Sequence, residues 1–439
     1  MEKIIISKNL YAHPLSMNRI ILIFSLSLVL AGCSASRQRR LHKNIVTIIN
    51  SRQFKNQFTG YIVFDPITKD TISNYNSEKY FLPASNTKIF TLYTALQLLA
   101  DRIPSIKYIS QNDTLYVEGT GDPSALHPFF KDSTLLHFLK KAKNIALHLN
   151  NFDGNSFGPG WAWEDYDHYY APERNSLPLY GNVTFISNID SLRIIPSYFK
   201  DSIVFSTAAK KRKLHQNVFY FDSLRKDTLE VPIITYANLT KELLETATHK
   251  KIELVSEMPA GKKEVLYGIL SDSLYKRMMY ESDNFIAEQL LIVSSSTLND
   301  TINSTIARDH ILVNQLSNLR QPPRWVDGSG LSRYNLFTPE SMMIVLQKMY
   351  AELPKDRLFS LFPAGGKKGT LIDLFKGNPK PYVFAKSGSM GNTYCLSGYL
   401  LTNSGKTLIF SFMNNHYRQS TNNIKKEMTS IFELLRDTY

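Results

Sequence analysis

The chain has 439 residues, 43% of them hydrophobic and 20% charged, and 51 basic against 38 acidic residues give a net charge of +13. This length and composition are typical of a globular protein with a large core, usually in two domains, and exclude a disordered or fibrous chain. The positive charge favours an anionic partner such as a membrane surface or an acidic polymer. Nucleic acid is not expected as a partner, because the basic residues are spread along the chain without a nucleic-acid-binding motif.

The N-terminal segment has the pattern of an export signal. Arg19 precedes an apolar run from Ile20 to Val29, which leads into Leu30-Ala31-Gly32-Cys33. A short apolar run before small residues is typical of a cleaved secretory signal and is too short for a membrane-spanning helix. The segment resembles a bacterial lipoprotein signal, which implies a signal peptide at residues 1–32 and a lipid on Cys33. The alternative is an ordinary signal peptide with an incidental cysteine.

We therefore expect an exported protein on the periplasmic side of a membrane, anchored there through lipidated Cys33. Residues 33–40 are small and basic and would form a tether. Ser34 directly after the lipidated cysteine favours the outer over the inner membrane, by analogy. With Cys33 lipidated, Cys395 is the one remaining cysteine, so no internal disulfide is expected.

The first part of the mature chain alternates between helical and strand patterns. A helix is predicted over Leu41 to Asn50, and strands over Thr59 to Asp65 and Thr71 to Tyr75. Pro83 disfavours helix before it. The apolar spacing beyond Ser85 then predicts a helix.

Residues 102–262 change character and are rich in short β-like runs. We expect them to form one or two β-rich modules, inserted between residues 41–101 and 263–439 of a single larger domain. The runs are Thr114 to Glu118, Ile145 to Leu149, Val183 to Ile186, Ser202 to Ser206 and Thr228 to Ile234.

Residues 263–439 are predicted to be helical at first and to end in strands and one helix. The spacing of Leu266, Ile269, Leu274 and Met278 predicts a helix over 263–295 that breaks at Glu281-Ser282-Asp283-Asn284. Thereafter we expect a helix over 304–318, a turn-rich loop at 327–332, a helix capped by Thr338-Pro339, strands over 382–385, 396–402 and 407–413, and a C-terminal amphipathic helix.

Ser85 and Lys88 form a Ser-x-x-Lys pattern at the start of a predicted helix. Residues three apart share one face of a helix, so a lysine held neutral can take the proton of the serine hydroxyl. Backbone N–H groups at the helix start can stabilise an oxyanion. The pattern alone is weak, because it occurs four times in the chain.

Two further motifs lie far away in the sequence. Ser282-Asp283-Asn284 falls at the predicted helix break, and Lys386-Ser387-Gly388 ends a predicted strand. Taken singly, the first is more simply a helix cap and the second a solvated strand end. Taken in this order with Ser85-x-x-Lys88, they are similar to the signature of β-lactamases and penicillin-binding proteins.

That resemblance implies a role for each motif residue. Ser85 would attack a carbonyl, and Lys88 would accept its proton. Lys386 would lower the pKa of Lys88 and pair with a substrate carboxylate. Ser282 would relay a proton to the leaving amine, and Asn284 would hold either Lys88 or a substrate amide.

The strand residues would bind the substrate. Lys386 and Gly388 would share one face of the strand, and the missing side chain of Gly388 would let a peptide lie alongside as an added strand. Ser387 keeps the hydroxyl of the commoner threonine. The backbone N–H groups of Ser85 and Ser389 would form the oxyanion hole.

The long separation between Ser85 and Ser282 distinguishes the chain from a compact β-lactamase. The chain resembles the D-alanyl-D-alanine carboxypeptidase/endopeptidases, which are low-molecular-mass penicillin-binding proteins with a large insertion between the first two motifs. Further segments that resemble this family are 118–123, 160–163, 170–172, 327–335, 362–365 and 369–371.

The family resemblance implies an α+β fold. It has a β-lactamase/transpeptidase-like domain, with a five-stranded antiparallel sheet flanked by helices, and an inserted β-rich domain. It also implies hydrolysis of D-Ala-D-Ala, or of D-Ala-containing cross-links, in peptidoglycan peptide stems through an acyl-enzyme on Ser85. β-Lactam antibiotics would then be inhibitors.

Two other functions stay open. A serine β-lactamase would need a water and a base placed for fast deacylation, and the sequence identifies neither. A catalytically silent, lipid-anchored cell-wall-binding module is disfavoured because all three motifs are kept. No metal or other cofactor is expected, since the ten histidines are scattered without a ligand spacing such as His-Glu-x-x-His.

Overall fold

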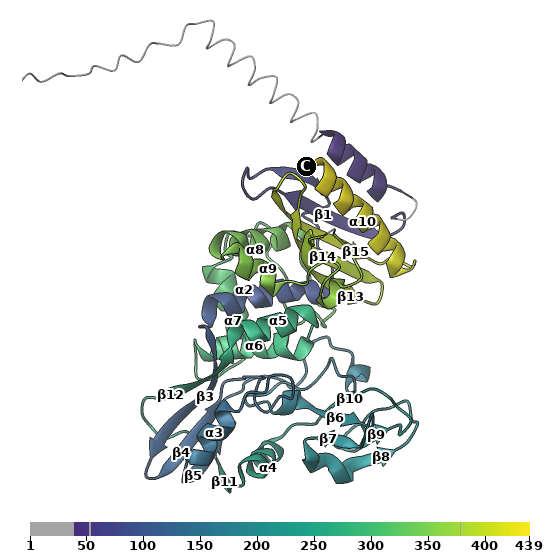
Figure 1. The fold of residues 1–439 in the computed structure, drawn as a ribbon. Helices are drawn as coiled ribbons and strands as arrows, with labels where there is room; N and C mark the ends of the chain where they lie inside the picture. Colours follow the sequence, from purple (N-terminus) through teal and green to yellow (C-terminus); the bar gives the residue numbers. More distant parts are fainter. Residues whose placement is uncertain (1–38, 52–53, 378) are drawn as a thin grey trace, which may run out of the picture.

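The computed structural model describes residues 39–439 apart from 52–53 and 378. The predicted signal peptide (1–32) and Cys33 lie outside these residues. Within the described part of the chain, no helix is both long enough and apolar enough to span a membrane. Figure 1 shows a sheet with its C-terminal helix at one end, a layer of helices in the middle, and the insertion at the other end.

The main sheet has five strands in the order β13-β14-β15-β1-β2. Every neighbouring pair is antiparallel, which confirms the predicted five-stranded antiparallel sheet. Its strands are β1 (Phe58–Phe64), β2 (Thr71–Tyr75), β13 (Val383–Met390), β14 (Thr393–Leu401) and β15 (Thr407–Asn415).

Both faces of the main sheet are buried. Successive side chains of a strand point to opposite faces, so Ile62 and Phe64 of β1 join one hydrophobic core, and Tyr61 and Val63 join another. The second core is closed by the helix at residues 39–49 and by α10 (Thr421–Thr438). A wholly antiparallel sheet packed against helices confirms the α+β class.

The middle layer of helices covers the other face of the sheet (Figure 1). At its centre is α2, which is buried from Lys88 to Ala95 and contacts α6 and α8. A helix that is apolar on nearly every side is expected to be buried in this way. The layer consists of α2 (Lys88–Leu98), α5 (Ser271–Tyr280), α6 (Asn284–Ser296), α7 (Ser304–Asn314), α8 (Pro339–Glu352) and α9 (Lys355–Leu361).

The start of α8 follows its predicted capping pattern. Thr338 Oγ1 accepts a hydrogen bond from Ser341 N at 3.0 Å, and the hydroxyl of Ser341 lies 3.1 Å from the backbone nitrogen of Thr338 and accepts its hydrogen bond. Pro339 occupies the first helical position, where no N–H is needed. The sequence therefore fixes this helix start locally.

The insertion has its own hydrophobic core and is rich in strands, as the fold-class prediction expected. Its largest sheet has the order β11-β5-β4-β3-β12, and smaller sheets are formed by β10-β6-β7 and β8-β9. Its elements are β3 (Arg102–Gln111), β4 (Thr114–Gly119), α3 (Thr134–Lys141), β5 (Asn144–His148), β6 (Val183–Ser187), β7 (Arg193–Ile195), β8 (Ile203–Phe205), β9 (Phe219–Phe221), β10 (Leu229–Pro232), α4 (Ala237–Thr248), β11 (Ile252–Val255) and β12 (Glu264–Leu270).

The prediction of helix from residue 263 is wrong for its first turns. Residues 264–270 form β12, which pairs antiparallel with β3, and the helix begins only at Ser271. The apolar spacing of Leu266, Ile269 and Leu274 fits a helix, but Val265 and Tyr267 favour a strand once β3 offers an edge. Because β12 completes the sheet of the insertion, we infer that the insertion extends to Leu270 rather than ending at residue 262.

Short 3₁₀ helices form several of the turns. They are η1 (Ala84–Thr87), η2 (Trp163–Asp165), η3 (Tyr180–Asn182), η4 (Ser197–Ser202) and η5 (Gly369–Leu371).

Candidate active site

Ser85 lies in η1, one turn before α2 begins at Lys88. The chain enters this turn through Ala84, whose φ of 46° is unusual for a residue with a side chain. Gly330 packs against this turn, where a Cβ would lie 1.9 Å from the carbonyl oxygen of Ala84. The loop around Gly330 therefore presses directly on the segment that presents Ser85.

Lys88 is fully buried beside Ser85. Its Nζ donates to Ser85 Oγ at 3.0 Å, to Asn284 Oδ1 at 2.7 Å and to the Ser329 carbonyl at 2.7 Å. Burial lowers the pKa of Lys88 to about 8, although nearby carboxylates oppose the shift. A lysine with this pKa is neutral often enough near neutral pH to accept the proton of Ser85.

Lys386 on β13 forms a second lysine–serine pair. Its Nζ donates to Ser282 Oγ at 2.8 Å and to the Ser387 carbonyl at 2.7 Å. Burial, followed by the charge of Lys88, lowers the pKa of Lys386 well below its usual value. The fold thus gathers Ser85, Lys88, Ser282, Asn284 and Lys386, which the sequence places far apart.

The Ser282-Asp283-Asn284 segment is also a helix cap. Asp283 accepts a hydrogen bond from Ile286 N at 3.0 Å at the start of α6. Ser282 has a φ of 57°, which turns its hydroxyl out of the helix direction toward Lys386. Asp283 therefore caps the helix, whereas its neighbours Ser282 and Asn284 contact the two lysines of the candidate site.

Asn284 joins the site to the insertion. Its Oδ1 accepts from Lys88, and its Nδ2 donates to the Tyr170 carbonyl at 3.0 Å. Both ends of the amide are therefore engaged by the protein. This favours the alternative in which Asn284 holds Lys88 over the one in which it binds a substrate amide.

Gly388 allows β13 to pack against the Ser85 turn. A Cβ on Gly388 would lie 2.6 Å from the Pro83 carbonyl oxygen and 2.9 Å from the Ser85 nitrogen. Asn86 strengthens this contact by donating from Nδ2 to the Lys386 carbonyl at 2.9 Å. The missing side chain thus serves the approach of two protein segments, a role that was not expected from the sequence.

Ser387 and Ser389, the other two serine residues of β13 that were predicted for the site, have different surroundings. The Ser387 hydroxyl donates to Thr370 Oγ1 at 2.8 Å, whereas Ser389 lines the cleft together with Ser85. The expected roles of Ser387 in substrate binding and of Ser389 in an oxyanion hole stay predictions.

Beneath Lys88 lies a buried network that sequence reasoning did not identify. Glu288 on α6 accepts from Ser329 N at 2.7 Å and pairs with Arg174 of the insertion at 3.2 Å. Burial and the nearby charge of Asp327 raise the pKa of Glu288, while Arg174 opposes the shift. The one signal for this network in the sequence is a glutamate, Glu288, within the otherwise largely apolar run of α6.

Asp327 holds the loop that contacts Lys88. Its carboxylate accepts from Gly330 N at 2.8 Å and from Ser332 N at 2.6 Å. Trp161 of the insertion donates to the same carboxylate at 2.9 Å. The loop thus depends on contacts between the two parts of the chain.

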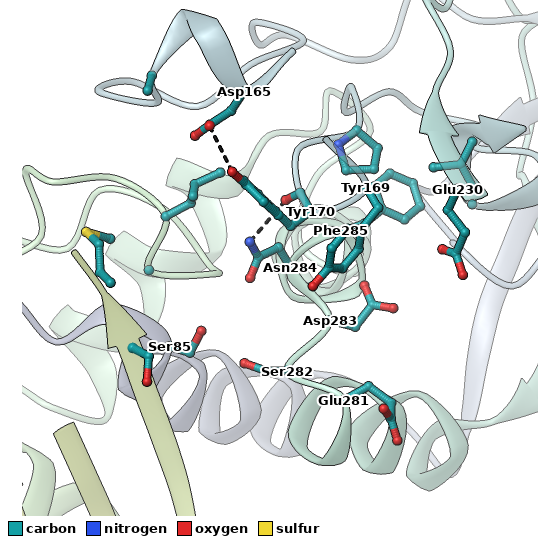
Figure 2. Close-up of a pocket in the computed structure, with 18 of the residues that line it drawn as sticks. Ser85, Asp165, Tyr169, Tyr170, Glu230, Glu281, Ser282, Asp283, Asn284 and Phe285 are labelled. Carbon is teal, nitrogen blue, oxygen red and sulfur yellow. Dashed lines mark hydrogen bonds between the residues drawn. The ribbon is translucent and has the colours of Figure 1, made fainter. Parts of the chain in front are cut away.

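A cleft of about 600 Å³ opens over these residues. Ser85, Ser282 and Ser389 line it from the main domain, and residues of the insertion such as Tyr169 and Tyr170 form the opposite wall (Figure 2). Among the described residues, no group of three or more His, Cys, Asp or Glu side chains is arranged to hold a metal ion.

A half-buried serine that lines the cleft beside a buried lysine, with a second serine–lysine pair close by, is the arrangement of a serine hydrolase that has lysine where others have histidine. The sequence profile of the D-Ala-D-Ala carboxypeptidase 3 (S13) family matches residues 41–193 and 236–435. The chain belongs to this family of peptidases, which confirms the family resemblance of its motifs.

Individual relatives agree with this assignment. The chain is 22% identical to D-alanyl-D-alanine carboxypeptidase DacB of Haemophilus influenzae, over 87% of its own length and 90% of the relative. The crystal structure of penicillin-binding protein 4 (dacB) from that organism matches with a TM-score of 0.72 and 20% identity, over 90% of this chain and 99% of that one. That protein has also been solved with a bound β-lactam.

A more distant structure shares the fold. A predatory peptidoglycan endopeptidase from Bdellovibrio bacteriovorus matches with a TM-score of 0.52 and 15% identity, over 87% of this chain and 93% of that one.

Proposed function

We propose that the protein is a serine D,D-peptidase that cleaves a terminal D-Ala, or a D-Ala-containing cross-link, in peptidoglycan peptide stems. The observation that carries the proposal is the 3.0 Å contact between Ser85 Oγ and the buried Nζ of Lys88. The facing pair of Ser282 and Lys386 supports it, as does membership of the D-Ala-D-Ala carboxypeptidase family.

Acylation would begin with neutral Lys88 taking the proton of Ser85 while Oγ bonds to the scissile carbonyl carbon. The backbone N–H groups of Ser85 and Ser389 would hold the oxyanion, and one such donor typically contributes about 3 kcal/mol. As the C–N bond breaks, the leaving amine takes a proton from the Ser282 hydroxyl, and Lys386 replaces it from Nζ. The lowered pKa of Lys386 makes it a good donor for this step.

Deacylation would reverse these transfers with water in place of the amine. The water oxygen bonds to the acyl carbon, and its proton passes through Ser282 to Lys386. Lys88 then returns its proton to Ser85 Oγ as the ester bond breaks. Both lysines end in their starting protonation states, so the cycle balances.

β-Lactams would acylate Ser85 in the same way, because their amide carbonyl takes the place of the scissile bond. The β-lactam complex of the Haemophilus relative supports this expectation. A slow loss of the adduct would favour the peptidase, and rapid turnover would favour the serine β-lactamase. The silent cell-wall-binding module would give no adduct.

The test combines labelling and product analysis. The wild-type protein and Ser85→Ala are incubated with a fluorescent penicillin and, separately, with purified cross-linked muropeptides. We expect a stable adduct on Ser85 and release of D-Ala or of separated stems by the wild type alone. Intact hydrolysis by Ser85→Ala would overturn the proposal.

We also propose that the protein is exported and anchored by a lipid on Cys33, as the sequence pattern at residues 20–33 indicates. Replacing Cys33 with Ser removes the thiol that would carry the lipid. We expect the variant in the soluble fraction of lysed cells and the wild type in the membrane fraction. Equal partition of the two would contradict the anchor.

A further inference from the structure

Residues 162–170 of the insertion form a segment at the edge of the cleft, which we call the outer rim. Glu164 and Asp165 of this segment line the cleft. The Tyr170 hydroxyl donates to Asp165 Oδ1 at 2.9 Å, and the Tyr170 carbonyl accepts from Asn284 at 3.0 Å (Figure 2). The outer rim is therefore fixed relative to the residue that contacts Lys88.

Trp163 leaves most of its side chain uncovered on the outer rim. It is 73% exposed, which is more than any other Phe, Tyr or Trp in the described part of the chain. The other two tryptophans, Trp161 and Trp325, instead donate their indole N–H groups to Asp327. Tyr169, which lines the cleft on the same rim, is 62% exposed. Exposed Trp and Tyr side chains are enriched where a protein surface is covered by a ligand or partner.

The Trp163 ring is held in one orientation. It lies parallel to the Tyr166 ring, with an angle of 10° between the planes and 6.4 Å between the ring centres. Tyr166 is buried and fixed in turn, because its hydroxyl donates to the Arg212 carbonyl at 3.0 Å and the Arg212 Cζ lies 5.2 Å from its ring centre. A preorganised ring loses little conformational freedom when a ligand packs on it.

Charged side chains adjoin this flat apolar surface. Glu164 follows Trp163 and is exposed, and the Nζ of exposed Lys210 lies 5.2 Å from the Tyr166 ring centre. Such a small aromatic surface does not fit an amphipathic helix or a lipid chain, which need a contiguous apolar area. A pyranose ring fits it, because the ring presents C–H groups on one face and hydroxyl groups around its edge.

We propose that the outer rim binds a sugar ring of the peptidoglycan glycan strand, stacked on Trp163. Glu164 and Lys210 would bind the hydroxyl and acetamido groups of the sugar. This rests on the proposed function, because a peptide stem that reaches Ser85 is attached to the glycan strand at its other end. The cleft that Ser85 lines is also lined by Glu164 and Tyr169 of the outer rim, and its volume of about 600 Å³ accommodates a peptide.

The experiment compares two substrates that carry the same pentapeptide ending in D-Ala-D-Ala. One is the free peptide, and the other bears the N-acetylglucosaminyl-N-acetylmuramyl disaccharide. Release of D-Ala gives kcat/KM for each substrate with the full-length protein. We expect kcat/KM to be about ten-fold higher for the sugar-bearing substrate, because a contact remote from the scissile bond also stabilises the transition state.

Trp163→Ala removes the proposed stacking surface. We expect it to reduce the ratio of the two kcat/KM values about ten-fold, and Trp163→Tyr to keep part of the ratio because an aromatic plane remains. Phe205→Ala is the matched control, because Phe205 is a 57% exposed aromatic residue of β8 in the same insertion and does not line the cleft. It should keep the wild-type ratio.

A binding measurement tests the sugar contact without turnover. Glycan strands from which the peptides have been removed are titrated into the full-length protein while tryptophan fluorescence is recorded. We expect a saturable change in the wild type that is lost in Trp163→Tyr, since the chain has only three tryptophans. The same change in both proteins, or none in the wild type, would contradict stacking on Trp163.

The outcomes separate the two proposals. If the wild type hydrolyses neither substrate and takes no penicillin label, the proposed function fails, and this proposal fails with it. If it hydrolyses both equally well, or if Trp163→Ala lowers both kcat/KM values by the same factor, the outer rim binds no sugar and the proposed function stands. Thermal unfolding of each variant excludes a folding defect.

Discussion

Lys88 is the residue on which the proposed chemistry depends, because it must be neutral to accept a proton and yet lies among carboxylates. Its pKa of about 8 results from burial, which outweighs the opposing charges of Asp327, Glu288 and Asp283. A lysine in water would have a pKa more than two units higher and would be almost wholly charged at neutral pH. Burial is therefore what makes the residue usable as a base.

The pKa of Lys88 predicts the pH dependence of acylation. Below pH 8, the neutral fraction of Lys88 increases about ten-fold for each unit by which the pH rises. Above pH 8 it levels off. We expect the second-order rate of labelling by a fluorescent penicillin to rise with pH toward 8 and to fall again at higher pH, because Lys386, the proposed proton donor, has a lowered pKa and loses its proton there. A flat profile would show that Lys88 is not the base.

Gly388 gives a second prediction at this scale. In Gly388→Ala, the new Cβ would lie 2.6 Å from the Pro83 carbonyl oxygen, so the Ser85 turn or β13 must move. A misplacement of about 1 Å at a reacting group costs roughly 100-fold in rate. We expect penicillin labelling to slow by about this factor while near-ultraviolet circular dichroism stays native. Wild-type labelling would contradict the close packing.

At the scale of elements, α6 connects the main domain to the insertion. Residues 285–296 of this helix are buried throughout, and its Glu288 pairs with Arg174 from the insertion. Asn284, at the start of the same helix, contacts both Lys88 and the backbone of Tyr170. One helix therefore positions Lys88, the proposed base, and the far wall of the cleft together.

Breaking the Arg174–Glu288 pair should destabilise this junction. Arg174→Met leaves a buried carboxylate without its cation, which costs about 3 kcal/mol or more. We expect a lower midpoint of urea unfolding, and a double variant with Glu288→Leu that recovers part of the loss. If the double variant were no more stable than Arg174→Met alone, the ion pair itself would contribute nothing to the stability.

The elements differ in how far the sequence predicts them. β1, β2, β14 and β15 are found where predicted, because their runs of apolar and β-branched residues are local signals. The sequence of β12 fits either a helix or a strand, and its pairing with β3 makes it a strand. The motif residues were found because they are an ordered set, whereas Arg174 and Glu288 meet only through tertiary packing.

For the whole molecule, the main point is that the main domain and the insertion both line the cleft. The insertion leaves and rejoins the main domain at adjacent positions, since Ser271 N donates to the Asp101 carbonyl at 2.8 Å. Chain segments with neighbouring ends can be removed without stretching the rest of the backbone. The insertion nevertheless supplies Trp161, Tyr170 and Arg174 to the site.

Replacing residues 102–270 by a short Gly-Ser linker tests this dependence. We expect the shortened protein to lose penicillin labelling, because Asn284, Asp327 and Glu288 all lose partners from the insertion. Labelling is compared with that of the full chain at equal protein concentration. Undiminished labelling would mean that the main domain shapes the site alone.

The adjacent ends of the insertion have one more consequence. Because Asp101 and Ser271 already touch, the segment between them is positioned like an interchangeable cassette. A chimera that carried a homologue's insertion, with Trp161, Tyr170 and Arg174 retained, would keep Ser85, the proposed nucleophile, and both lysines of the site. Its choice of peptide would then come from the donor of the cassette.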